Sequence, residues 1–269
     1  MGSRVSYIAD KLAGKASSRA DKSIDMNESS TQKQHLPPGY ARPMKPSGLA
    51  GARRAGPSGK AGLIAAELEY RLTTGKYGFG EDISSSELAE EFGASRHPVA
   101  VALNYLNTRG YIDVLPQIGY RVVAPTRTEI ADMFLGLARI EALIASLASQ
   151  RQTPEEGELL VRIAEQNRYA GLGAAAENEH YIACIGDFHQ QLRYMARSAV
   201  ISDASASWNR LSSFYLWQGL PEVLPKTTDT LNAERVEIAH AVASGQTDRA
   251  QQIMEAHIVH KPYLTGILD

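Results

Sequence analysis

From about residue 62 onward, apolar residues recur at the intervals of amphipathic helices. Ile64, Leu68 and Leu72 repeat every four residues and therefore share one helix face. They predict a helix that begins near Gly62 and ends at Gly75, because glycine is a common residue just beyond a helix end.

Two short helices are expected next. Ser84 and Glu87 have the spacing of a capping box, which predicts a helix start, and Gly93 is expected to end that helix. Ser95 is expected to cap a third helix, which ends at Gly110. The apolar face of this third helix comprises Val99, Leu103 and Leu106. Two short helices joined by a tight turn favour a helix-turn-helix.

After the third helix, the pattern changes to that of strands. Residues 111–115 and 120–123 are rich in β-forming residues and flank a turn that contains Pro116 and Gly119. They predict a β-hairpin. A hairpin that directly follows a helix-turn-helix is a wing.

From Thr128 to the end, helical signals dominate, and neither a strand pair nor an internal repeat is evident. Helical segments separated by Pro, Gly or Ser clusters are expected at 130–150, 154–169, 178–196, 201–218, 228–244 and 248–258. The predicted fold class is mainly α. It comprises an N-terminal winged helix-turn-helix, with three helices and a β-hairpin wing, and a C-terminal all-α bundle of about six helices.

The expected domains are a tail at 1–58, a winged helix-turn-helix at 59–126 and a helical domain at 127–269. The tail is rich in Ser, Lys, Gly and Pro and has few large apolar residues, so we expect it to be disordered. It is also basic, because residues 1–60 carry 11 Lys and Arg against 4 Asp and Glu. Arg53 and Arg54 could contact DNA phosphates or belong to a solvated linker.

Charge and composition constrain the function only in part. The residues after 60 carry 17 basic and 26 acidic side chains, so net charge neither demonstrates nor excludes DNA binding. Cys184, the single cysteine, lies in an apolar run and predicts a buried thiol in a reducing compartment. There is no apolar run long enough to span a membrane and no signal peptide, so we expect a cytoplasmic protein without a membrane partner.

Several residues at fixed spacing follow the first predicted helix, namely 95–99, Ala102 with Leu103, Leu106, 109–111, Pro116 and Gly119. Together with the order of the elements, this set resembles the signature of the GntR family of bacterial transcription regulators across residues 62–125. The resemblance implies that the third helix lies in the major groove of DNA and that the wing approaches the backbone or the minor groove.

The candidate contacts with double-stranded DNA are the residues of the third helix outside its apolar face, together with the wing tip. They are Ser95, Arg96, His97, Ala100, Asn104, Gln117 and Gly119. Arg96 is the first candidate for base recognition, because a guanidinium can donate two hydrogen bonds to a guanine edge. Asn104 lies further along the helix and could pair with adenine or reach only phosphate.

The sequence departs from the family at three positions. Ala100 stands where the family usually has Arg, Val101 where it has Glu, and Ile118 where it has Arg. Two contacts that carry charge are therefore missing. Either the operator differs and the affinity for DNA is lower, or the tail around Arg53 and Arg54 makes up for part of the missing charged contacts. A domain that no longer binds DNA is the remaining alternative.

Residues from about 128 to the end resemble the all-helical effector domain of the FadR subgroup, which is called FCD. The motifs that carry the resemblance are Phe188-His189 with Leu192, then 234–238, 241–245, Ala250, Met254 and His257-Ile258. This domain implies the sensing of a small molecule and the assembly of a homodimer on a palindromic operator.

Many FCD domains hold a metal ion with one Asp and three His. By resemblance, this chain keeps His189 and His257 but has Ile185 at the Asp position and Arg235 at the remaining His position. Arginine cannot bind a metal ion, and its charge opposes one. We therefore expect no metal and no other cofactor.

The candidate effector site comprises His189, Arg235 and His257. A guanidinium can hold a carboxylate or phosphate in a two-point fork, so an anionic effector such as a carboxylate is expected. Alternatively, Arg235 pairs with an internal acid such as Glu234 or Glu255, the pocket is vestigial and the domain serves only for dimerisation.

No activated nucleophile, carboxylate pair or intact metal site is evident at a recognisable spacing, so an enzyme is not expected. The sequence thus predicts a ligand-responsive bacterial transcription regulator, with repression as the expected mode of action.

Overall fold

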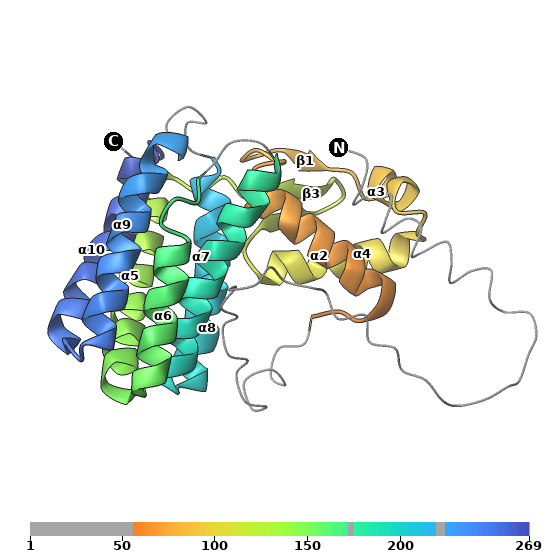
Figure 1. The fold of residues 1–269 in the computed structure, drawn as a ribbon. Coiled ribbons are helices and arrows are strands. Elements are labelled where there is room, and N and C mark those ends of the chain that lie inside the picture. The colour runs from red at the N-terminus through yellow and green to blue at the C-terminus, as the bar shows by residue number, and fades with distance from the viewer. Residues whose placement is uncertain (1–55, 172–174, 219–223, 269) are drawn as a thin grey trace, which may run out of the picture.

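The computed structural model describes residues 56–171, 175–218 and 224–268 of the chain (Figure 1). The tail that the sequence predicts at 1–58 lies almost entirely outside the described residues. Within them, the fold is mainly helical with one small antiparallel sheet, which confirms the predicted fold class. We call residues 56–123 the head and residues 127–268 the helical unit.

Three helices form the body of the head. They are α2 (Gly59–Thr73), α3 (Ser85–Glu91) and α4 (Arg96–Thr108). The apolar residues that the periodicity predicted are buried between them, with Ile64, Leu68, Leu72, Val99, Leu103 and Leu106 all fully shielded from solvent. Gly93 has a φ of 50° in the tight turn between α3 and α4, a backbone conformation that glycine adopts without strain.

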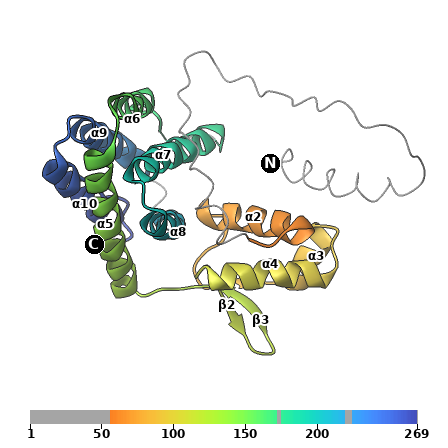
Figure 2. The same cartoon turned by 90° about the horizontal axis from the view of Figure 1, so that it is seen from below.

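The wing follows α4 directly. Strands β2 (Ile112–Leu115) and β3 (Gly119–Val122) pair antiparallel, with Ile112 opposite Val122. The sequence did not predict a third strand, β1 (Asp82–Ile83), which pairs with the other edge of β3 and gives the sheet order β1-β3-β2. Figure 2 shows the β2–β3 hairpin extending away from the helices of the head.

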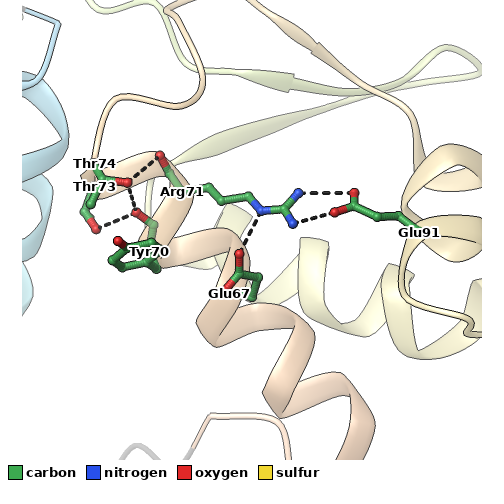
Figure 3. A network of polar contacts seen from close by, with 6 residues as sticks. All are labelled: Glu67, Tyr70, Arg71, Thr73, Thr74 and Glu91. Atoms are coloured by element: carbon green, nitrogen blue, oxygen red, sulfur yellow. Dashed lines mark hydrogen bonds and ion pairs between the residues drawn. The ribbon is translucent and has the colours of Figure 1, made fainter. Parts of the chain in front are cut away.

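Arg71 of α2 ties the first helix to the helix-turn-helix. Its Nε donates to Glu67 Oε1 at 2.9 Å, and its two terminal nitrogens reach the Glu91 carboxylate of α3 at 3.1 and 2.5 Å (Figure 3). A planar guanidinium held by two carboxylates fixes direction as well as distance. Next to it, the Thr73 and Thr74 hydroxyls donate back to the carbonyl oxygen of Tyr70, where α2 ends.

The predicted caps are formed only in part. Ser84 Oγ accepts from the backbone N–H of Glu87 at 3.2 Å, which is half of the expected capping box. Ser95 occupies the N-cap position of α4, but its hydroxyl makes no capping hydrogen bond. Two complete capping boxes occur in the helical unit, where Thr126 and Thr153 begin helices.

The helical unit contains six helices within the described residues, as the sequence predicted. They are α5 (Arg127–Arg151), α6 (Pro154–Gln166), α7 (Ala175–Ala196), α8 (Ala199–Leu216), α9 (Leu224–Ala243) and α10 (Thr247–Leu264). The long α5 packs against α7, α8, α9 and α10, so it forms the centre of the bundle (Figure 1). None of the described helices is long and apolar enough to cross a membrane.

Helix α8 joins the bundle to the head and lies next to α2 (Figure 2). The fully buried ring of Phe214 meets Phe79 and Tyr111 of the head edge-on, at centroid distances of 5.4 and 5.6 Å. The Gln218 side chain accepts from the N–H of Phe79 at 3.2 Å and donates to the carbonyl oxygen of Tyr77 at 3.0 Å. The two units therefore share an ordered, partly apolar interface.

Candidate functional site

The residues predicted to contact DNA belong to α4, its N-cap and the wing. Ser95 at the N-cap and Arg96, His97 and Asn104 of α4 are exposed, and so is Gln117 in the wing turn. Ala100 and Gly119 are half-buried. The Tyr120 hydroxyl of β3 donates to Asn104 Oδ1 at 3.4 Å, which connects the wing to α4.

Arg96 is a cation among the residues predicted to contact DNA, and Ile118 is an exposed apolar side chain next to them in the wing turn. Among the described residues, Arg96 has no salt bridge, so its guanidinium can pair with DNA without breaking an internal contact. Ile118 is 76% exposed at the wing tip. The wing thus presents an apolar tip where the family usually has an arginine.

The helical unit contains a cavity of about 460 Å³. Helices α7, α8, α9 and α10 supply most of its wall, and α2 of the head closes one side. Six charged residues line the cavity, namely Glu69, Asp187, Arg193, Arg210, Arg235 and Lys261. A cavity of this size suits a small metabolite, and the excess of cationic side chains favours an anion.

Arg235 is 5% exposed in this wall and has no carboxylate partner among the described residues. Its terminal nitrogens donate to Asn232 Oδ1 and, at 3.4 Å, to the Tyr181 hydroxyl, while Nε has no hydrogen-bond partner. Glu234 bonds His257 instead, and Glu255 pairs with Arg139 at 2.6 Å. Neither of the two acids considered from the sequence neutralises Arg235.

Lys261 of α10 is a second buried cation in the wall and is only 4% exposed. Its ammonium makes no hydrogen bond or salt bridge with the described part of the chain. Burial, together with the neighbouring Arg235, lowers its pKa to about 7, although Glu141 and Glu234 act in the opposite direction. Sequence reasoning missed Lys261, although its position four residues after His257 placed it on the same helix face.

His189 lines the cavity as a neutral imidazole. Its Nδ1 lies 2.8 Å from Glu141 Oε2, and Glu141 also accepts from Ser205 and, at 2.7 Å, from Asn209. Burial alone would raise the pKa of Glu141, but His189, Arg193 and the Ser205 hydroxyl lower it to about 2. Burial lowers the pKa of His189 to about 4 despite the attraction of Glu141. With Nδ1–H donated to Glu141, the unpartnered Nε2 is left as an acceptor.

His257 is buried but does not line the cavity. Its Nδ1 lies 2.5 Å from Glu234 Oε2, and its Nε2 has no partner. Burial, with Lys261 and Arg235 nearby, lowers its pKa well below the usual value, so the ring is neutral. Of the three predicted effector residues, His189 and Arg235 reach the cavity and His257 lies behind its wall.

The residues do not fit the metal ion that the resemblance implies. Both His189 and His257 use Nδ1 for a carboxylate and leave Nε2 free, as metal-binding histidines do. However, Ile185 offers no donor atom, and Arg235 and Lys261 place two positive charges close by. Among the described residues, there is no group of three or more His, Cys, Asp or Glu side chains that could hold a metal.

Two residues of α7 also belong to this site. Asp187 lies in the cavity wall, two positions before His189 on the same helix. Arg193 lines the cavity one turn further along and donates to Ser205 Oγ at 3.4 Å. Its spacing of four from His189 was a usable signal, but an arginine near a helix end usually indicates a solvated face.

Two family models match the chain. The model for bacterial regulatory proteins of the gntR family matches residues 60–122, and the model for the FCD domain matches residues 132–260. The first covers the three helices of the head and the wing, and the second covers most of the helical unit.

Similar proteins are regulators as well. The chain is 26% identical over 212 residues to the Exu regulon transcriptional regulator of Escherichia coli (strain K12), a match that covers 72% of this chain and 80% of the relative. It is 23% identical over 198 residues to the uncharacterized HTH-type transcriptional regulator YdhC of Bacillus subtilis (strain 168), covering 72% and 85%.

Two solved structures share the fold. E. coli McbR/YncC superposes with a TM-score of 0.61 at 17% identity, over 77% of this chain and 96% of the other. A GntR protein of Rhodococcus sp. RHA1 superposes with a TM-score of 0.60 at 16% identity, over 77% and 98%.

The buried ammonium of Lys261 makes stability depend on pH. Its pKa is about 7 in the folded protein and 10.5 ordinarily, so the unfolded chain binds this proton more tightly between those values. Raising the pH from 7 to 10.5 therefore favours the folded state. We predict that Lys261→Met is more stable than the wild type at pH 7 and that this advantage shrinks as the pH rises.

Urea unfolding of both proteins from pH 6.5 to 9.5 measures the advantage. Lys76→Met, which removes an exposed lysine of the head, is the control and should differ from the wild type by a constant amount. A stability difference for Lys261→Met that does not change with pH would contradict the burial of a cation at this position.

Proposed function

Since the chain belongs to the gntR family of DNA-binding transcriptional regulators and carries an FCD effector domain, we propose that it represses transcription in response to a small anion. In this proposal it acts in the cytoplasm as a homodimer on a palindromic operator, and it has no catalytic role. The head reads DNA, and the cavity of the helical unit receives the effector.

The DNA contact is proposed on α4 and the wing. Arg96 is exposed, unpaired within the described residues and located in the first turn of α4, the end of a recognition helix that faces base edges. Ser95 supports the same contact, because its hydroxyl is not used for capping. Two heads about one turn of duplex apart would read the two halves of a palindrome.

The observation that carries the sensor proposal is the pair of buried cations in the cavity wall. Arg235 and Lys261 are almost fully removed from water, and neither has a carboxylate within salt-bridge distance in the described residues. A buried charge without a partner is costly, so a site that retains two of them fits a ligand that supplies the opposite charge. Next to them, His189 Nε2 can accept a hydrogen bond from a ligand hydroxyl.

No metal ion has a part in this proposal. The guanidinium and the ammonium supply the positive charge that the ion supplies elsewhere in the family, and they contact the anion directly. Anion binding would also raise the pKa of Lys261 and so hold its proton near neutral pH.

The alternative is that the helical unit only dimerises the protein and the cavity is vestigial. An internal salt bridge to Arg235 was the feature expected for that case. The arginine lacks one, and the cavity has kept a size suited to a ligand. These two observations favour the sensor.

We predict that Arg96→Ala weakens binding to the operator by about tenfold to a hundredfold, the value of one two-point contact with guanine. The operator is obtained by selecting fragments from random DNA with the wild-type protein, and affinity is measured by mobility shift. Arg139→Ala removes an exposed arginine of the helical unit and should bind as the wild type does. Equal affinity of Arg96→Ala and the wild type would remove Arg96 from the DNA contact.

We predict that Arg235→Gln loses the response to small carboxylates. Thermal-shift screening of mono- and dicarboxylates identifies those that raise the Tm of the wild type, and Arg235→Gln should bind them at least about tenfold more weakly. Its affinity for the selected DNA without ligand should be unchanged, because the head is intact. An Arg235→Gln protein that binds the same carboxylates with wild-type affinity would contradict the proposed sensor.

A further inference from the structure

One side of the effector cavity is closed by the head rather than by the helical unit. Glu69 and Thr73 of α2 both line the cavity, together with α8 residues that include Asn209 and Arg210. A ligand that fills this end of the cavity would therefore touch the unit that is proposed to bind DNA. The cavity and the interface between the units meet at this point.

An ion pair stands at this meeting point. Arg210 Nε of α8 lies 3.1 Å from Glu69 Oε1 of α2, and the buried Tyr111 hydroxyl donates to the same oxygen at 3.1 Å. The Arg210 side chain is 44% exposed and that of Glu69 is 20% exposed, so both can rearrange without opening a core. Glu69 of the head is thus paired with Arg210, one of the cations in the cavity wall.

The cations of the cavity form two pairs. Arg235 is close enough to Lys261 to lower the pKa of Lys261. Burial lowers the pKa of Arg193, and the nearby Arg210 lowers it further. Glu141 acts on both Lys261 and Arg193, so it is near both pairs. Arg210 lies where α2 of the head closes the cavity, because it pairs with Glu69, whereas Arg235 and Lys261 belong to the wall formed by α9 and α10.

The helix that carries Arg210 also carries the contacts with the head. Asn209, Arg210 and Ser213 line the cavity, whereas Phe214 packs against the head and Gln218, just beyond α8, bonds its backbone. Trp217 lines the cavity and also lies against Gly75 of the head, where a side chain in place of the glycine hydrogen would meet the Trp217 Cβ at 3.3 Å. Arg210 therefore lies only four to eight residues before these contacts with the head.

We propose that the end of the cavity at Arg193 and Arg210 is a second anion subsite, in which an acidic group of the effector competes with Glu69 for Arg210. This inference rests on the proposed function, because the other end of the effector is held by Arg235 and Lys261. The effector is then a small dianion such as a dicarboxylate. Its second acidic group repels Glu69, breaks the ion pair and loosens the contact between the head and α8.

The first arm of the test follows this contact by hydrogen exchange in the full chain without DNA. The backbone N–H of Phe79 bonds Gln218, so the peptide over residues 75–80 reports whether the head and α8 are in contact. Glutarate should raise its exchange rate in the wild type, and butyrate should leave it unchanged. Glu69→Gln, which keeps an acceptor for Tyr111 but loses the charge, should show the raised rate without any ligand.

Arg139→Gln is the matched control for this arm, because it breaks the ion pair with Glu255 at 2.6 Å in the helical unit, away from the cavity wall. Its peptide should exchange as in the wild type. Exchange in Glu69→Gln equal to that of the wild type would overturn the proposed competition, and so would a glutarate response that persists unchanged in Arg210→Gln.

The second arm measures affinity by calorimetry. The wild type should bind glutarate about tenfold more tightly than butyrate, the value of one additional charge-assisted contact, and Arg210→Gln should remove this preference while keeping its affinity for butyrate. Equal binding of the two acids by the wild type would overturn the second subsite alone. If neither acid binds the wild type, the proposed anion sensor fails, and the second subsite fails with it.

Discussion

The burial of positive charge in the helical unit is the constraint on which the interpretation of this protein depends. Arg235 and Lys261 lie in one cavity wall, are nearly inaccessible to water and lack a carboxylate partner among the described residues. Removing a charge from water is costly unless an opposite charge and hydrogen bonds replace the solvent. The two histidines nearby are neutral and each uses a carboxylate of its own, so they relieve none of this cost. The anionic effector proposed above would supply the opposite charge.

The same cavity explains how sensing and DNA binding can be parts of one structure. Helix α8 contributes polar residues to the cavity wall and an aromatic contact with the head. Helix α2 of the head contributes Glu69 to the same wall, where it pairs with Arg210. The elements of the head are tied to one another, because Arg71 links α2 to α3 and the wing pairs with β1. A change at the ion pair between Glu69 and Arg210 would therefore move the head as a body, and a ligand shifts this equilibrium only by its preference for one arrangement.

Local sequence signals predicted most of the fold and only part of the site. Helical periodicity and turn residues are local, so the helices from α2 to α10 and the wing were predictable, whereas β1 has two residues and exists only because β3 is beside it. The resemblance to FCD domains singled out Arg235 and His189. Lys261, Glu141 and Arg193 were missed, because the burial of a charged side chain is a property of tertiary packing. His257 was assigned to the site, but packing places it behind the wall.

The central claim is that protein cations take the place of the metal ion in this FCD cavity. Elemental analysis of the full chain, purified without chelator and dialysed against metal-free buffer, tests this claim most directly. The account predicts no stoichiometric zinc, nickel or manganese, because Ile185 and Arg235 occupy two of the family's four ligand positions and Lys261 adds a further charge. One full equivalent of any of these metals per chain would contradict it.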